Sequence, residues 1–130
     1  MTSVLLDTHA LVWAVGDPAR LGDSARRLIQ DRNTDLLISA ATAWEIATKV
    51  RIGRFPDGEL FVDRWSEVLQ RLQAQEMAIT AEHAMFTGSL DWPHRDPFDR
   101  VIAAQSLLER VPLLSADTAF AGLPGLRVRW

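Results

Sequence analysis

The stretch VLLDTHALVWAVGDP, residues 4–18, decides the fold class. It begins with three apolar residues, enough for a short buried strand, and this run ends at Asp7. Residues 8–15 are apolar on most sides, as in a helix that is buried or faces a partner, and Gly16-Asp17-Pro18 ends that helix. A strand that passes directly into a helix is a building unit of α/β proteins.

The same alternation continues to the end of the chain. Strands are predicted over residues 4–6, 36–38, 77–79, 111–114 and 126–130, and helices over 8–15, 23–32, 41–52, 59–73, 81–89 and 98–110. The helix over 59–73 has the clearest pattern, because apolar residues recur on one face at Phe61, Trp65, Val68, Leu69 and Leu72. Most of the strands are short and nearly all apolar, as in parallel sheets that are buried on both faces. We therefore predict an α/β fold with a parallel sheet covered by helices on both sides.

Composition limits the class of protein. The chain has 130 residues, of which 48% are hydrophobic and 24% charged, so we expect one globular domain over residues 1–130. It has no cysteine, which excludes a disulfide framework, a thiolate zinc site and a cysteine nucleophile. The net charge is −3 and neither half is basic, so a broad positive face is not expected. The first residues resemble neither a signal peptide nor a membrane span, and we expect a cytoplasmic protein.

Carboxylates follow the predicted strands. Asp7 ends the first strand, Glu45 lies about one turn into the helix after the second, Asp96 and Asp99 open the helix after residues 90–97, and Asp117 follows the fourth strand. Ligands of parallel α/β sheets bind beyond the carboxyl ends of the strands, so these acids are candidates for one site. No Ser–His–Asp arrangement or glycine-rich phosphate loop competes with them.

Each acid also has a structural explanation. Asp7 and Asp117 fit helix caps, residues 42–45 match a capping box that ends in Glu45, and Asp96 precedes a proline as an N-cap does. A group of acids would repel one another, however, and a structural role could be filled by Ser, Thr or Asn. Grouped carboxylates suit Mg²⁺ or Mn²⁺, which activates water for phosphodiester hydrolysis. We favour that chemistry.

Five segments together resemble a known family. These are VLLDTHALVW at 4–13, SAATAWEIATK at 39–49, HRDPFDRVIAAQ at 94–105, LLSAD at 113–117 and the closing residues 128–130. In this order they resemble PIN-domain ribonucleases, and more closely the VapC toxins of bacterial type II toxin–antitoxin pairs. The resemblance covers essentially the whole chain. It implies a three-layer α/β/α sandwich with a mostly parallel five-stranded sheet.

The resemblance also implies a site and an activity. The activity is endonucleolytic cleavage of RNA with Mg²⁺ or Mn²⁺, and the catalytic and metal-binding acids fall on Asp7, Glu45, Asp99 and Asp117. Thr8, Asp96 and Ser115 are expected to surround these ligands, Asp96 first of all as an N-cap. Lys49, Arg95 and Arg100 flank the acids, and we expect them to contact RNA phosphates.

Partners follow from the same resemblance. It implies a homodimer and a neutralising antitoxin, with no membrane. Candidate docking surfaces are the apolar residues 11–13 and the stripe Phe61, Trp65, Leu69 and Leu72, although core packing is the favoured explanation for each of them. Two other functions stay open, namely a catalytically inactive binding module of the same fold and a phosphotransfer or phosphatase domain with Asp7 as nucleophile. The latter usually needs a second nearby acid and a lysine beside the phosphate, whereas Lys49 is the only lysine.

Overall fold

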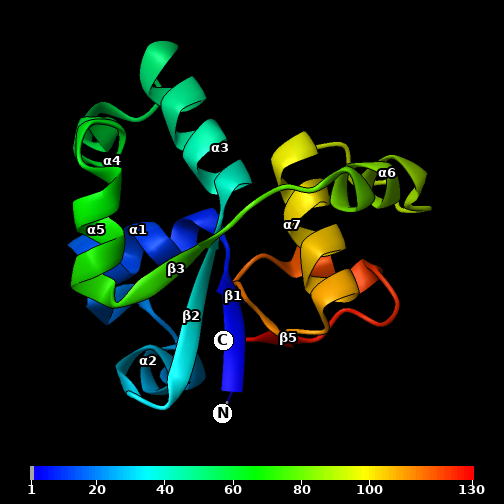
Figure 1. Ribbon diagram of the computed structural model, residues 1–130, viewed down its shortest axis with the longest axis horizontal. Helices are drawn as coiled ribbons and strands as arrows, with labels where there is room; N and C mark the ends of the chain where they lie inside the picture. The colour runs from blue at the N-terminus through cyan, green and yellow to red at the C-terminus, as the bar shows by residue number, and fades with distance from the viewer. Residues whose placement is uncertain (1) are drawn as a thin grey trace.

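Five parallel strands form one sheet in a computed structural model that describes residues 2–130 (Figure 1). The strands are β1 (Thr2–Leu6), β2 (Thr34–Ser39), β3 (Ala74–Met77), β4 (Leu113–Leu114) and β5 (Val128–Arg129). Their order across the sheet is β3-β2-β1-β4-β5, and every neighbouring pair is parallel. The predicted parallel sheet and the edge position of the last strand are confirmed.

Helices cover both faces of the sheet. The α-helices are α1 (Thr8–Gly16), α2 (Asp23–Gln30), α3 (Ala40–Arg51), α4 (Glu59–Asp63), α5 (Trp65–Leu72), α6 (Ala81–Ser89) and α7 (Pro97–Glu109), and short 3-10 turns are η1 (Pro18–Arg20), η2 (Pro56–Gly58) and η3 (Thr118–Gly122). Figure 1 shows α1, α2 and α5 on one side of the strands and α6 and α7 on the other. The predicted three-layer α/β/α sandwich is therefore confirmed. Within residues 2–130, no helix has both the length and the apolar character needed to cross a bilayer.

The pleat of β1 explains its uninterrupted apolar run. Val4 and Leu6 lie in the core beneath α1, α2 and α5, while Leu5 lies in the opposite core beside Ile102 of α7 and Phe120 of η3. Successive side chains of a strand point to opposite faces, so a strand covered on both faces needs an apolar residue at every position. All three strand residues are fully buried.

Two differences from the predicted elements exceed two residues, while the other ends agree within one or two residues. The helix expected over 59–73 is two helices, because Arg64 leaves helical geometry with φ −133° and ψ 37°. The break lets α4 pack on α3 while α5 packs on β3, and side-chain periodicity does not record such a change of direction. The third strand lies at 74–77 rather than 77–79, because exposed Gln75 and Glu76 give this edge strand no apolar signature.

The last residue is held against the start of α2. The backbone N–H of Ser24 donates to the carbonyl of Trp130 at 3.1 Å. The Trp130 ring contacts Trp13 with centroids 5.6 Å apart, and the Arg20 guanidinium lies 4.4 Å from the centroid of the Trp13 ring. Gly22 leaves room for this arrangement, because a Cβ there would lie 2.5 Å from the Trp130 carbonyl carbon.

We expect Gly22→Ala to destabilise the protein by about 1–3 kcal/mol, because Trp130 must shift to make room for the new methyl group. The Gly22 backbone, at φ −65°, accepts alanine, so the cost is steric. The matched control is Gly88→Ala in α6, where a Cβ meets nothing within 4 Å and replacing glycine should add about 0.5–1 kcal/mol. Thermal unfolding by circular dichroism measures both. Equal melting temperatures for the two variants would contradict the expectation.

Candidate active site

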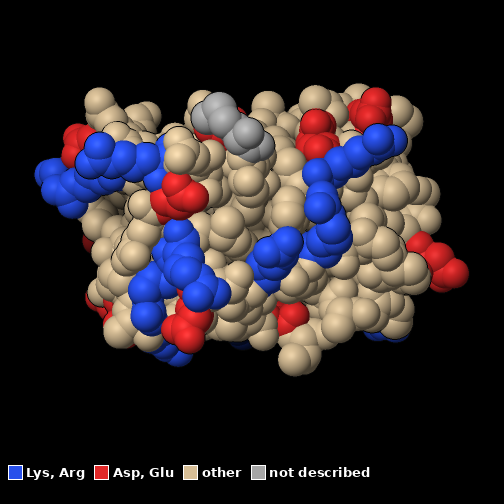
Figure 2. All heavy atoms as spheres, turned by 90° about the horizontal axis from the view of Figure 1, so that it is seen from below, with Lys and Arg blue, Asp and Glu red and all other residues tan. Residues whose placement is uncertain are grey.

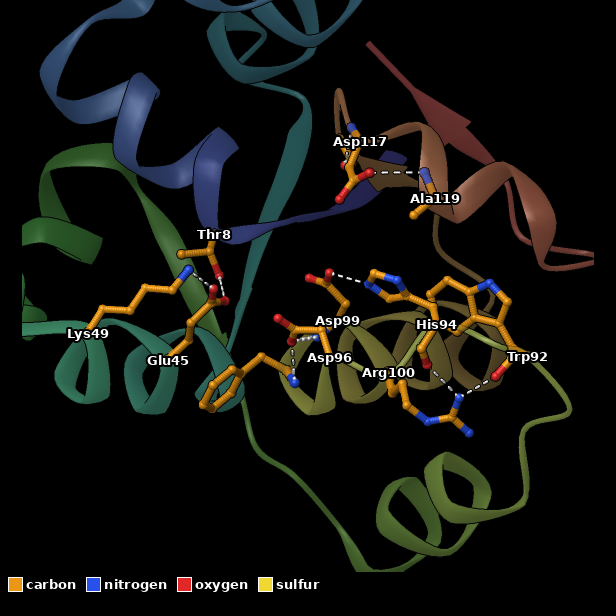
Figure 3. Close-up of polar contacts among 12 residues, drawn as sticks. Thr8, Glu45, Lys49, Trp92, His94, Asp96, Asp99, Arg100, Asp117 and Ala119 are labelled. Carbon is orange, nitrogen blue, oxygen red and sulfur yellow. Dashed lines mark hydrogen bonds and ion pairs between the residues drawn. The ribbon is translucent and has the colours of Figure 1, made fainter. Parts of the chain in front are cut away.

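The predicted acids all lie at the carboxyl end of the sheet. Asp7 follows β1 directly, and Asp117 follows β4 after a short segment. β1 and β4 are neighbours in the sheet. The chain places β2 and β3 on one side of β1 and then β4 and β5 on the other side, so the direction of winding reverses between β1 and β4. Glu45 lies on α3 after β2, and Asp99 lies in the first turn of α7. Figure 3 shows Asp99 between Glu45 and His94, with Asp117 entering from the β4 side.

Asp7 is a helix cap and a buried carboxylate at the same time. Its exposed fraction is 4%, and its Oδ1 accepts the backbone N–H of Ala10 at 2.8 Å, which caps α1 as predicted. Burial raises the pKa of the Asp7 carboxyl, and the charge of Glu45 raises it further. Hydrogen bonds from Ser115 and Ala10 oppose that rise in pKa. Asp7 and Glu45 are therefore close enough to repel each other, as a shared site requires.

Glu45 has both carboxylate oxygens engaged. The Thr8 hydroxyl donates to Oε1 at 2.6 Å, and the Lys49 ammonium contacts Oε2 at 2.5 Å (Figure 3). The capping-box interpretation of Glu45 is wrong, because the cap of α3 is Ser39, whose hydroxyl accepts the N–H of Ala41. Lys49 is on α3 one turn after Glu45, so it offsets a carboxylate that is only 4% exposed.

Asp99 lies at the centre of the site and is partly buried. Its Oδ2 is 2.7 Å from Nε2 of His94. Burial is the main cause that raises the Asp99 pKa to about 6, and repulsion by Asp96 and Glu45 adds to it, while the His94 contact lowers it. Asp96 caps α7 as predicted, since its Oδ1 accepts the N–H groups of Phe98 and Asp99 at 2.9 and 3.1 Å. Asp96 therefore acts as a helix cap, and its charge also acts on the neighbouring Asp99.

Sequence reasoning placed His94 beside Asp96 and Asp99 but did not predict its contact with Asp99. Its contact with Asp99 spans five residues across a loop that has no regular structure, so no helical or strand periodicity marks it. The ring also packs on Trp92, with centroids 4.8 Å apart. The only available signal was the position of His94 in the HRDPFDR segment.

Arg100 holds the loop that carries His94. Its two terminal nitrogens donate to four backbone carbonyls, those of Trp92 (2.7 Å), His94 (2.9 Å), Thr87 (3.2 Å) and Leu90 (2.8 Å). Figure 3 shows the first two of these bonds. The Arg100 guanidinium is thus already bound to the backbone, and the expected contact of Arg100 with RNA stays a prediction. Arg95, on the same loop, is exposed.

Asp117 is the outlying acid. It is exposed, and its Oδ1 caps η3 by accepting the N–H of Ala119 at 2.9 Å. Its own N–H donates to the hydroxyl of Ser115 at 3.0 Å, and Ser115 also bonds Asp7. Ser115 therefore lies between the two acids that follow β1 and β4, and its place around metal ligands stays a prediction.

These acids suit a divalent cation that keeps most of its bound waters, rather than a metal ion whose ligands all come from the protein. Within residues 2–130, no three His, Asp or Glu side chains converge as a preformed metal site. Mg²⁺ typically takes one or two protein carboxylates directly and keeps several waters. Burial raises the pKa of Asp7 and of Asp99, so a bound cation would offset the cost of keeping these carboxylates ionised. Such donors fit an ion of this kind.

Charge elsewhere is mixed. Figure 2 looks at the molecule from below Figure 1 and shows Lys and Arg side chains in separate groups, with Asp and Glu beside them and uncharged surface between. On this face the absence of a broad basic surface agrees with the net charge of −3.

Comparison with known proteins places the chain in a family. The family model of the PIN domain matches residues 4–126. A chain of VapBC2 from Rickettsia felis, bound to a DNA fragment from the promoter, has a TM-score of 0.71 at 18% identity over 98% of both chains. DNA-bound VapBC from Salmonella typhimurium gives 0.70 at 17% identity, over 99% of this chain and 98% of that one. A toxin–antitoxin complex from Klebsiella pneumoniae gives 0.65 at 21% identity, over 98% and 96%.

At these identities the solved structures show likeness of fold. No match is found among proteins with curated functions. The fold of the chain agrees with its match to the family model, and the acids predicted from the sequence lie at the carboxyl end of this sheet.

We expect Arg100→Ala to lower the free energy of unfolding by about 2–4 kcal/mol, because four carbonyls lose a charged donor. Arg95→Ala removes the same type of side chain from an exposed position of the same loop and should change stability by about 0.5 kcal/mol or less. Chemical denaturation followed by fluorescence measures both. A loss for Arg95→Ala as large as for Arg100→Ala would show that Arg100 is not what orders the loop.

We expect removal of the Asp99 charge to change how stability depends on pH when no divalent ion is present. The folded-state pKa of Asp99 is about 6, above the value of about 3.9 in an unfolded chain. Between these values the folded protein binds more protons than the unfolded chain, so stability falls as pH rises from about 4 to about 6.5. Asp99→Asn should show a smaller fall and a higher melting temperature at neutral pH.

Thermal unfolding in a chelating buffer at several pH values tests this difference. Asp63→Asn, which removes an exposed acid from α4, is the control and should follow the parent protein. Added Mg²⁺ or Mn²⁺ should then stabilise the parent more than Asp99→Asn, by mass action on the folded state. If parent and Asp99→Asn lose stability equally between acid and neutral pH, the buried-charge account of Asp99 is wrong.

Proposed function

This chain belongs to the PIN domain family, and on that premise we propose that it is a cytoplasmic, divalent-metal-dependent endoribonuclease, the toxin of a type II toxin–antitoxin pair. It would cleave cellular RNA, inhibit translation and growth, and be neutralised by a cognate antitoxin. One observation carries the proposal. Acids from three separate elements lie at the carboxyl end of the sheet, where the charge of Glu45 adds to the rise in the pKa of both Asp7 and Asp99. A fold with only structural needs has no reason to gather these charges.

Asp7 and Asp99 would be the main ligands of Mg²⁺ or Mn²⁺, with Glu45 and Asp117 orienting waters or a second ion. When bound, such an ion supplies a water of lowered pKa and offsets the charge of the attacked phosphate. The chain's own groups set the geometry. Thr8 and Lys49 fix the Glu45 carboxylate from two sides, and His94 fixes one oxygen of Asp99.

RNA would reach the site along local positive charge. Lys49 is partly exposed while it pairs with Glu45, so it can contact a phosphate next to the acids. Arg95 is exposed beside Asp96, in a shallow hollow that is also lined by Trp92, Pro93 and His94. Cations on both sides of an acidic centre suit a polyanion whose central phosphate is bound through a metal ion.

The antitoxin would dock on the face formed by α1, α4 and α5. Of the predicted docking residues, Leu11, Phe61 and Leu69 are buried in the core, as plain core packing predicts. Next to them lies a hollow with an apolar floor that includes Val15 and Leu72 and a charged rim, lined by Ala14, Val15, Leu60, Arg64, Glu67, Val68, Arg71 and Leu72. This lining suits an amphipathic segment of a partner protein. The homodimer stays a prediction.

The phosphotransfer alternative has less support. It needs a lysine to bind the phosphate on Asp7, and Lys49, the only lysine, is paired with Glu45. An inactive binding module has no need to keep two buried acids, Asp7 and Glu45, at the same end of the sheet. Measurement of activity separates all three functions.

We expect the purified protein to fragment RNA with Mg²⁺ or Mn²⁺ and not in a chelator. Asp7→Asn and Asp99→Asn should each lower kcat/KM by about 100-fold or more, which corresponds to loss of about 3 kcal/mol of transition-state stabilisation. Asp117→Asn should cost less, because Asp117 is exposed and lies at the edge of the site. The matched control Asp63→Asn, an exposed acid on α4, should cleave like the parent.

Induction of the protein alone in cells, with new RNA ends mapped against an Asp7→Asn control, identifies the RNA target. Absence of metal-dependent cleavage on any RNA would favour the inactive binding module. Transient phosphorylation of Asp7 would favour the phosphotransfer domain.

A further inference from the structure

Two aromatic rings bridge the helices that carry the acids. Trp44 on α3 and Phe98 on α7 pack edge to face, with ring centroids 4.7 Å apart and planes 80° apart. Trp44 is 54% exposed, so much of its indole surface faces solvent. Neither ring belongs to one of the two hydrophobic cores, so core packing does not account for the pair.

The aromatic pair lies beside the acidic site. Trp44 directly precedes Glu45, and Phe98 directly precedes Asp99. Glu45 and Asp99 repel each other across the gap between α3 and α7, and the two rings span the same gap. Contact with Phe98 restrains the exposed indole between the two helices that carry these acids. A substrate that reaches Asp99 from this side therefore passes a rigid aromatic surface.

We propose that Trp44 and Phe98 form a stacking platform for one unpaired nucleobase of single-stranded RNA, next to the phosphate that is attacked. This inference rests on the proposed function. Proteins that bind single strands combine cations that follow the phosphates with aromatic side chains that stack on the bases. Both kinds of group occur here, because Lys49 lies five residues after Trp44 on α3 and exposed Arg95 lies just before α7.

The platform requires the base to be unpaired. A paired base inside a duplex has both faces covered by its neighbours, so it cannot stack on Trp44 without leaving the helix. Stacking depends on ring area, so a purine gains more than a pyrimidine, and every base gains something. The site would thus select single-stranded or looped RNA without reading a long sequence.

The test is a binding cycle that combines protein variants with altered RNA. A short labelled single-stranded RNA is titrated with protein in a buffer that contains Ca²⁺, and binding is followed by fluorescence anisotropy. Copies of this RNA that each carry one abasic position, at a different site in each copy, are titrated in the same way. The proteins are the parent, Trp44→Ala, Trp44→Phe and Met85→Ala. Met85 is 71% exposed on α6 and serves as the matched control for loss of an exposed apolar side chain.

We expect Trp44→Ala to weaken binding about 10-fold, within the range for loss of one stacked base, and Trp44→Phe to restore most of it. One abasic position should weaken binding to the parent by a similar factor and have almost no further effect in Trp44→Ala. Met85→Ala should bind like the parent, and duplex RNA should compete poorly. Melting temperatures of all variants establish that they are folded.

Three results would overturn the inference. One is that no abasic position has a smaller effect on binding in Trp44→Ala than in the parent. Another is that the RNA does not bind the parent protein. The third is a change of molecular mass by light scattering in Trp44→Ala, which would assign the rings to contact with a second copy of the chain. Binding does not require cleavage, so a parent that couples to one base but never cleaves RNA would refute the proposed function and leave the platform standing. A parent that cleaves RNA but shows no coupling between Trp44 and any base would support the proposed function and refute the platform.

Discussion

Burial of negative charge at the carboxyl end of the sheet is the constraint on which the rest depends. Asp7 and Glu45 are each only 4% exposed, and an ionised carboxylate is costly to remove from water unless donors replace its hydration. Those donors come from α1, from α3 and from the end of β4, with Ala10 and Ser115 serving Asp7 and Thr8 and Lys49 serving Glu45. The site exists only when α1, α3 and the end of β4 are all in place, so folding and site assembly are one event.

Support for Asp99 extends this constraint to the loop before α7. The loop has no regular secondary structure between residues 90 and 96, so its backbone carbonyls need donors from elsewhere. Arg100 supplies them, and in doing so it sets His94 against Asp99. A guanidinium suits this task because its planar fork reaches several acceptors at once, which an ammonium cannot do in the same way. A cation close to the acids thus acts on them through the backbone.

Local features of the site were predictable and long-range ones were not. Asp7, Asp96 and Asp117 were recognised as caps because a cap bonds N–H groups two or three residues away. The Thr8–Glu45 bond joins residues 37 positions apart, so only the parallel pairing of β1 and β2 brings them together. The capping-box pattern at residues 42–45 misled because Ser39 had already capped α3.

The helix break at Arg64 and the backbone contacts of Arg100 were not predicted from the sequence, and the physical reason is the same for both. Each depends on which element lies opposite, and a periodic pattern records only which face is apolar. The order of strands and helices, by contrast, follows from short apolar runs and from the residues that end them. That is why the sheet and the position of its acids could be inferred before the packing of the helices.

Capping and ligand roles in the same residues determine how the site should be mutated. Asp7 gives one oxygen to α1, so replacement by alanine removes a cap along with the charge and destabilises the helix start by about 1 kcal/mol. Asparagine keeps an oxygen for the N–H of Ala10 and removes only the charge. An inactive alanine variant would therefore leave folding and chemistry confounded, whereas an inactive but stable asparagine variant isolates the carboxylate. The charge that makes these acids costly to bury is the property that a divalent cation would use, and the cap holds that charge in place.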